Sequence, residues 1–229
     1  MFDFVRRRGT SLALVLLVEL AIAVAQGAIA YSFTLGGLGQ RLGVDVSVLA
    51  ADGPLTRLGL VALMAALWLL GRKSALFKLV VAANAIATLA LLVHTAFLAK
   101  VLAGLSFRAV DELLLDVVLI SVSNVLTFAV WYWIVDPPGV DERRDEGEPW
   151  AFLFPQRASA LPGYETWVPG FTDYLYVAFT TSFAFSPTDT LPLTRTAKML
   201  MLLQAAIAVV TLTGIAGSAI NILAGGAGG

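Results

Sequence analysis

The chain of 229 residues contains no cysteine. Disulfide frameworks, thiolate nucleophiles and cysteine-ligated zinc sites are therefore excluded, whatever the compartment. Histidine occurs only once, as His94. A lone histidine is more typical of a hydrogen-bonded packing residue than of a metal ligand. We accordingly expect no metal site and no bound cofactor.

Charged residues are also scarce, at 14% of the chain, whereas soluble domains carry about 25%. The 15 basic and 16 acidic side chains leave no net positive field, so nucleic acid is not an expected partner. Hydrophobic residues make up 59% of the chain. This composition predicts an integral membrane protein whose first partner is the lipid bilayer.

Five stretches have the length and apolar character that membrane-crossing helices require, because a helix needs about 20 mostly apolar residues to span the hydrocarbon layer. The second is the shortest and reaches full length only if Leu55 and Thr56 join it. The five stretches are Ser11–Thr34, Arg57–Leu70, Ala75–Ala99, Glu112–Val135 and Arg195–Leu223.

The distribution of basic residues orients these spans, since cytoplasmic loops carry an excess of Lys and Arg. One set of alternate loops holds Arg6, Arg7, Arg8, Arg72, Lys73, Lys78, Arg143, Arg144 and Arg157, and the opposite set holds Arg41, Arg57, Lys100 and Arg108. The nine-to-four bias predicts a multi-pass protein of the cell membrane with a cytoplasmic N-terminus.

The first span also allows another interpretation. Three arginines, an apolar run and the triplet Ala28-Ile29-Ala30 fit a secretory signal with a cleavage site. Glu19 and Gln26, seven residues apart on one helical face, instead fit a span that packs against other helices. Either interpretation leaves the orientation of the later spans unchanged.

The segment 171–194 differs from the five spans. Its apolar part, from Tyr174 to Phe185, is too short to cross a bilayer as a helix and stops before Pro187. Such a segment is typical of a re-entrant helix and loop, which is tolerated at membrane depth only where protein or water covers it. The sequence therefore predicts an all-α integral membrane protein with a four-helix region (residues 1–136), an extramembrane loop (137–170) and a C-terminal part (171–229) that holds the re-entrant segment and the fifth span.

Two resemblances concern this C-terminal part. The residues Asp173, Tyr174, Leu175, Tyr176, Phe179, Phe185, Asp189 and Thr194 resemble the C-terminal signature of a family of uncharacterised bacterial multispanning membrane proteins, which also has four spans before the signature and one after it. More distantly, Thr180-Thr181 and the pattern Asp189-x-x-Pro192-x-Thr194 are similar to the pore region of potassium channels. These resemblances imply a pore-like loop.

The likeness to potassium channels has two departures. The filter glycines are replaced by residues 184–188, Ala-Phe-Ser-Pro-Thr, so potassium selectivity of the familiar kind is not expected. In addition, Arg195 and Lys198 extend the cytoplasmic charge excess to eleven against four, so the loop would enter from the inside.

The candidate functional residues fall into two groups. The first comprises the hydroxyl and carboxylate side chains of the loop, which would attract a cation near the negative end of the short helix: Thr180, Thr181, Ser186, Thr188 and Asp189. For Asp189, capping the last helix or pairing with Arg195 or Lys198 is an open alternative. The second group is the polar face of the last helix, which suits either pore lining or tight helix packing: Gln204, Thr211, Ser218 and Asn221.

Three functional classes follow. The first is a channel-like protein, possible only as a homo-oligomer because one loop cannot encircle an ion; a tetramer is expected by analogy. The second is a non-conducting subunit that packs against other membrane subunits. The third, an enzyme, is disfavoured because the sequence has no H-E-x-x-H, no G-x-S-x-G and no paired-carboxylate motif, and thus no catalytic residue to propose.

Overall fold

The computed structural model describes residues 2–35, 54–104, 110–136, 150–158, 162–164, 167–184 and 189–226. Helices dominate this part of the chain, as expected. The elements are α1 (Phe2–Leu35), α4 (Pro54–Leu69), α5 (Lys73–Gly104), α6 (Val110–Val135), β1 (Phe152–Leu153), α7 (Pro155–Ala158), α8 (Phe171–Ala184), β2 (Leu191–Pro192) and α9 (Arg195–Gly226).

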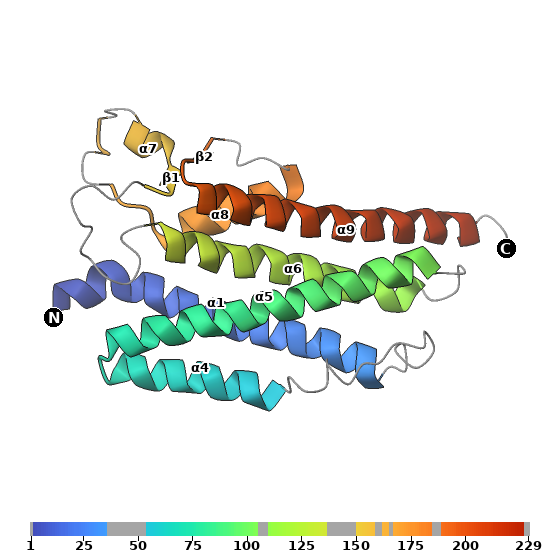
Figure 1. The fold of residues 1–229 in the computed structure, drawn as a ribbon, viewed down its shortest axis with the longest axis horizontal. Coiled ribbons are helices and arrows are strands. Elements are labelled where there is room, and N and C mark those ends of the chain that lie inside the picture. Colours follow the sequence, from blue (N-terminus) through green and yellow to red (C-terminus); the bar gives the residue numbers. More distant parts are fainter. Residues whose placement is uncertain are drawn as a thin grey trace.

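The long helices lie side by side in one elongated bundle (Figure 1). Four of them, α1, α5, α6 and α9, are long and apolar enough to cross a membrane. The architecture is that of a multi-pass, mostly helical membrane protein. Helix α4, expected to be the second span, has 16 residues and a rise of about 24 Å, which is short of the usual spanning length. In Figure 1 it ends before α1 and α5 do at the same side.

Helix α4 is joined to α5 by a tight turn at Gly71. The amide of Arg72 donates to the carbonyl of Leu67 at 3.0 Å, and the amide of Gly71 donates to that of Trp68 at 3.0 Å. This is the bonding pattern of a Schellman cap, which needs a left-handed residue, and Gly71 supplies it with φ of 68°. The turn returns the chain beside α4 and places α5 antiparallel to it.

Helix α6 is the centre of the bundle, since it packs against α1, α5, α8 and α9. Its side chains Val117, Ile120, Phe128 and Tyr132 are fully buried. In a membrane this inward face contacts protein, whereas the outward faces of α1, α5 and α9 carry exposed leucines and valines that suit lipid contact.

Helix α8 lies along α6 and α9, and the chain then returns to the end of the bundle at which α8 began (Figure 1). Strand β2 forms an antiparallel ladder with β1, in which Phe152 lies opposite Pro192 and Leu153 opposite Leu191. The amide of Leu193 also donates to the carbonyl of Ala151 at 2.8 Å. We refer to residues 171–194 as the α8 hairpin; residues 185–188 within it lie outside the described part of the chain.

Candidate functional site

One side of α8 is enclosed by the bundle and the other is open. Tyr174, Val177, Ala178 and Thr181 are buried on the enclosed side. On the open side, Tyr176, Phe179 and Phe183 are about half exposed, and the rings of Phe179 and Phe183 lie 4.7 Å apart between centroids. The pattern follows the 3.6-residue helical period, so one short helix presents a protein-facing side and an exposed aromatic side.

Gln204 of α9 fastens the enclosed side of α8. Its fully buried Nε2 donates to the carbonyl of Ala178 at 2.7 Å and to the hydroxyl of Ser182 at 2.8 Å. Its Oε1 accepts a hydrogen bond from the Tyr132 hydroxyl of α6. The side chain of Asn124, also on α6, donates to the backbone carbonyl of Gln204 at 3.2 Å. These bonds join three helices in a low-dielectric interior, where each is costly to leave unmade.

Asp136 fastens the beginning of the hairpin. This carboxylate follows the last residue of α6 and accepts hydrogen bonds from the Tyr174 hydroxyl at 2.7 Å, the Ala151 amide at 2.8 Å and the Phe152 amide at 3.3 Å. Arg157 forms an ion pair with it at 3.4 Å. One buried carboxylate thus connects α6, β1, α7 and α8.

Asp136 is buried, and aromatic rings pack on its partners Tyr174 and Arg157. Phe154 contacts both Trp167 and Tyr174 with ring centroids 5.6 Å apart, and the guanidinium of Arg157 lies 3.4 Å from the centroid of the Trp150 ring. Burial raises the pKa of Tyr174 well above its usual value, and the Asp136 carboxylate adds to that shift. The phenol therefore stays protonated and remains a donor to Asp136.

Sequence reasoning did not identify Asp136 as a site residue. Its position in the sequence could have indicated a site. A carboxylate directly after a helix C-terminus lies at the negative end of the helix dipole, which is unfavourable unless hydrogen-bond donors stabilise it. Those donors come from segments 15 to 38 residues further along the chain. The segment with Ala151, Phe152 and Phe154 is also buried. No local sequence pattern predicted this burial.

The described loop candidates occupy different surroundings. The hydroxyls of Thr180 and Thr181 donate to carbonyls of α8 itself, at 3.0 Å to Tyr176 and 2.7 Å to Val177 respectively. Thr181 is buried on the enclosed side, whereas Thr180 is partly exposed. Ser186 and Thr188 lie outside the described residues.

Asp189 is exposed and accepts a hydrogen bond from the Thr190 hydroxyl at 3.2 Å. The start of α9 has a cap of its own, because the Thr194 hydroxyl accepts a hydrogen bond from the Ala197 amide at 3.2 Å. Thr194 therefore takes the N-cap position that Asp189 was considered for.

Two of the four candidate residues on the polar face of α9 have described side chains, and both face the protein interior. Gln204 is fully buried, and the buried Thr211 donates to the carbonyls of Ala208 at 3.0 Å and Ile207 at 3.3 Å. Ser218 and Asn221 lie on α9, but their side chains lie outside the described part. Of the two roles considered for this face, helix packing fits Gln204 and Thr211.

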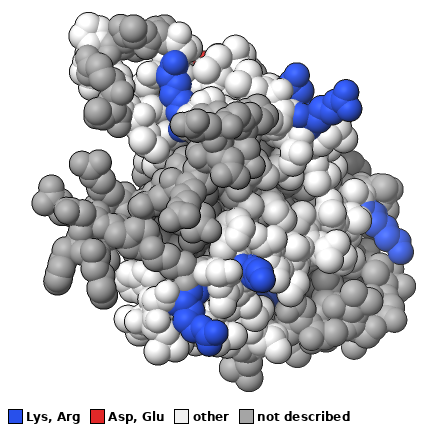
Figure 2. Space-filling model, turned by 60° about the vertical axis from the view of Figure 1, so that its left-hand side comes forward, with Lys and Arg blue, Asp and Glu red and all other residues white. Residues whose placement is uncertain are grey.

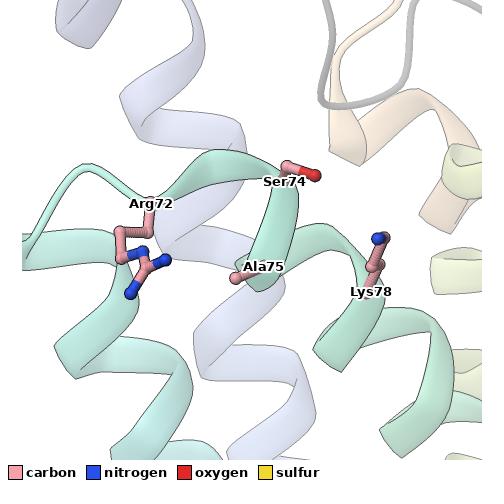
Figure 3. A pocket seen from close by; sticks show the side chains of 4 residues that line it. All are labelled: Arg72, Ser74, Ala75 and Lys78. Atoms are coloured by element: carbon pink, nitrogen blue, oxygen red, sulfur yellow. The ribbon is translucent and has the colours of Figure 1, made fainter.

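Several basic side chains lie at the end of the bundle where the α8 hairpin begins and ends. Figure 2 shows this end with scattered Lys and Arg and almost no Asp or Glu among the residues it describes. At the α4–α5 turn, Arg72, Ser74, Ala75 and Lys78 line an open pocket of about 390 Å³ (Figure 3). Arg72 and Lys78 belong to the set of basic residues that the sequence predicts on the cytoplasmic side.

No group of three His, Asp or Glu side chains that could hold a metal ion occurs among the residues that the structure describes. His94 is buried in α5. In comparisons with known proteins, no protein family, no curated protein and no solved structure matches the chain. The four long apolar helices define its class as a multi-pass helical membrane protein.

Proposed function

We propose that the chain is a channel-like membrane protein with five membrane-crossing helices, in which the α8 hairpin is a re-entrant element and several copies together form a path for cations. The observation that carries the proposal is the arrangement of α6, α8 and α9. The short helix α8 packs against both α6 and α9, and the chain on both sides of α8 is held at the same end of the bundle.

The length of α8 supports a re-entrant role. Its 14 residues rise about 21 Å, less than the roughly 30 Å of the hydrocarbon layer. A short helix at this depth must be covered by protein or water, and α6 and α9 cover its buried side. The open side would be covered by neighbouring copies in a ring, as one hairpin cannot enclose an ion.

The cation preference rests on Asp189. This exposed carboxylate follows α8 in the chain, and its negative charge would attract cations and repel anions. Thr180 is partly exposed one turn before the end of α8. Among the described candidates, Thr180 and Asp189 are therefore the pore-loop residues assigned to the path, whereas Gln204 holds α8 in place and Thr211 is buried on α9.

Flux from liposomes containing the purified protein tests this function. We expect a leak of monovalent cations that Asp189→Asn lowers by about tenfold or more, the effect of roughly 1.4 kcal/mol on a barrier. Asp173→Asn is the matched control: Asp173 accepts a hydrogen bond from the Gly170 amide at 2.7 Å, and asparagine can retain that cap. Absence of flux for every ion, or equal flux from both variants and the wild type, would contradict conduction.

A second candidate, a non-conducting subunit of a larger membrane complex, is favoured by one observation. Gln204 and Thr211 are buried within the chain, so the polar face of α9 already has an internal packing role. The oligomeric state in native-like nanodiscs separates the two candidates. A ring of identical chains supports the channel, whereas a monomer bound to other proteins supports the subunit.

A further inference from the structure

A second polar site lies at the turn between α4 and α5, away from the α8 hairpin. Arg72, Ser74, Ala75 and Lys78 line an open pocket of about 390 Å³ at this turn (Figure 3). Small-ligand sites typically have volumes of roughly 300–1,000 Å³, so the pocket is large enough for one. The site is separate from the proposed cation path and does not depend on it.

The polar side chains of the pocket favour an anion. Arg72 supplies a guanidinium and Lys78 an ammonium group, and both side chains are exposed. Within the described part of the chain, neither of them takes part in an ion pair. Ser74, four residues before Lys78 on the same face of α5, adds a hydroxyl donor. Two cationic groups and a hydroxyl suit the oxygens of a phosphate group.

The start of α5 adds to this preference for an anion. The Leu76 amide donates to the carbonyl of Arg72 at 3.0 Å, so Arg72 takes the N-cap position of the helix. A guanidinium has no acceptor atom, so it cannot cap the first amides of α5 as Ser, Thr, Asp or Asn would. An anion in the pocket would therefore meet free amide donors and the positive end of the helix dipole.

The length of α5 places this turn at the depth of lipid headgroups. The helix has 32 residues and rises about 48 Å, whereas a bilayer is roughly 30 Å thick in its hydrocarbon core and about 40–45 Å with its headgroups. Directly before the turn, Trp68, Leu69 and Leu70 are exposed. An exposed tryptophan beside leucines is typical of the membrane interface. Basic and apolar side chains thus occur together at this turn, as binding of an anionic lipid requires.

We propose that this pocket binds the phosphate group of an anionic phospholipid. Arg72 and Lys78 pair with the phosphate oxygens, the Ser74 hydroxyl donates to one of them, and the acyl chains contact the exposed leucines at the end of α4. Basic pockets at the ends of membrane-spanning helices are suited to such headgroups. A soluble phosphate offers the same oxygens, but only a lipid also uses the apolar side chains beside the turn.

Native mass spectrometry of the full chain tests the site, because it counts the lipids that stay bound after release from mixed micelles. We expect the chain to retain phosphatidylglycerol in preference to phosphatidylcholine. The double variant Arg72→Gln/Lys78→Gln should weaken this binding by roughly tenfold to thirtyfold, the effect of two basic groups near a membrane surface. Arg195→Gln/Lys198→Gln is the matched control, since it removes one exposed Arg and one exposed Lys from the first turn of α9, outside the pocket. Equal losses in the two double variants would indicate diffuse attraction to surface charge and would overturn the proposal.

Filling the pocket gives a second test that changes no charge. Ala75→Leu places a larger side chain on the pocket wall and should weaken retention of phosphatidylglycerol. Ala96→Leu, on the exposed surface of the same helix, should leave retention unchanged. Unchanged retention in Ala75→Leu would mean that the lipid binds elsewhere and would overturn the proposal. Excess inorganic phosphate should leave the lipid bound, and complete displacement of the lipid would assign the pocket to a soluble phosphate instead.

Discussion

Gln204 shows how one side chain connects several elements. It bonds to Ala178 and Ser182 of α8 and to Tyr132 of α6, and all of these groups are buried. Each hydrogen bond stabilises the folded chain by only about 0.6 to 1.5 kcal/mol, because the same groups find other partners in the unfolded chain. Removing the amide, however, leaves its partners unpaired in the interior.

Gln204→Leu keeps the side-chain volume nearly unchanged and removes these bonds. We expect it to lower the free energy of unfolding by about 2–3 kcal/mol, from the lost bonds and the unpaired groups. Denaturant-induced unfolding in detergent micelles measures this difference. Thr213→Ala is the matched control on the same helix, since Thr213 is exposed and bonds only to the carbonyl of Val209. Equal losses in the two variants would contradict the role of Gln204.

Tyr174 has an equally specific role at the start of the hairpin. Its hydroxyl donates to a carboxylate, a bond worth about 1.5–3 kcal/mol, so Tyr174→Phe should destabilise the protein by about that amount. Tyr176→Phe, two residues further along on the exposed side, should have little effect. Thermal unfolding of both variants in detergent gives the comparison, and similar midpoints would show that the Asp136 bond contributes nothing.

The raised pKa of Tyr174 leads us to expect that the stability of the fold depends on pH. This pKa is raised in the folded chain, so the folded chain holds this proton more tightly than the unfolded chain does. The contribution of this group to stability is therefore complete below about pH 10 and decreases as the pH rises above that value. Unfolding measured on the alkaline side should show a steeper loss of stability in the wild type than in Tyr174→Phe.

At the scale of elements, the hydrophobic pattern predicted where the helices lie. The fourth stretch, expected at Glu112–Val135, is found at Val110–Val135, and the last, expected from Arg195, begins there. Both positions follow from local properties, because the apolar run sets the length and Thr194 caps the start of α9. The short apolar part of the hairpin was likewise expected to be a separate helix, and α8 is one.

Contacts between distant segments were not predictable from the same patterns. The sequence pattern indicated that Gln26 is buried but not that Arg57 is its partner, since Arg57 lies in the first turn of a short helix whose depth depends on packing. The two-residue ladder of β1 and β2 is too short for a periodic signal. The Asp136 site depends on residues from four separate elements, so its composition required the folded structure.

The register of the β1–β2 ladder can be tested by disulfide cross-linking. The chain has no cysteine of its own, so only the introduced cysteines can react. Leu153→Cys combined with Leu191→Cys should form a disulfide under mild oxidation, because the two residues lie directly opposite in the ladder. Mass spectrometry of peptides digested without reductant detects the link. Leu153→Cys with Met199→Cys, on the exposed surface of α9, is the control. Equal cross-linking of both pairs would mean that the ladder does not hold β2 in this register.

At the scale of the whole molecule, the start of α8, strand β2 and the Asp136 site lie at one end of the bundle. Figure 2 shows Lys and Arg on that end. The two halves have different polar interiors. Helices α6, α8 and α9 share the bonds around Gln204, whereas α1, α4 and α5 enclose Glu19 and Arg57. The proposed function requires that the hairpin starts and ends on the same side of the membrane.

Cysteine accessibility tests that dependence most directly. Tyr164 precedes the hairpin, Leu193 closes it, and both side chains are a little under half exposed. With a membrane-impermeant thiol reagent, we predict that Tyr164→Cys and Leu193→Cys are both protected in intact cells and both labelled in inside-out vesicles, whereas Val48→Cys shows the opposite pattern. Labelling of Tyr164→Cys and Leu193→Cys from opposite sides would mean that the segment crosses the membrane and would contradict the account.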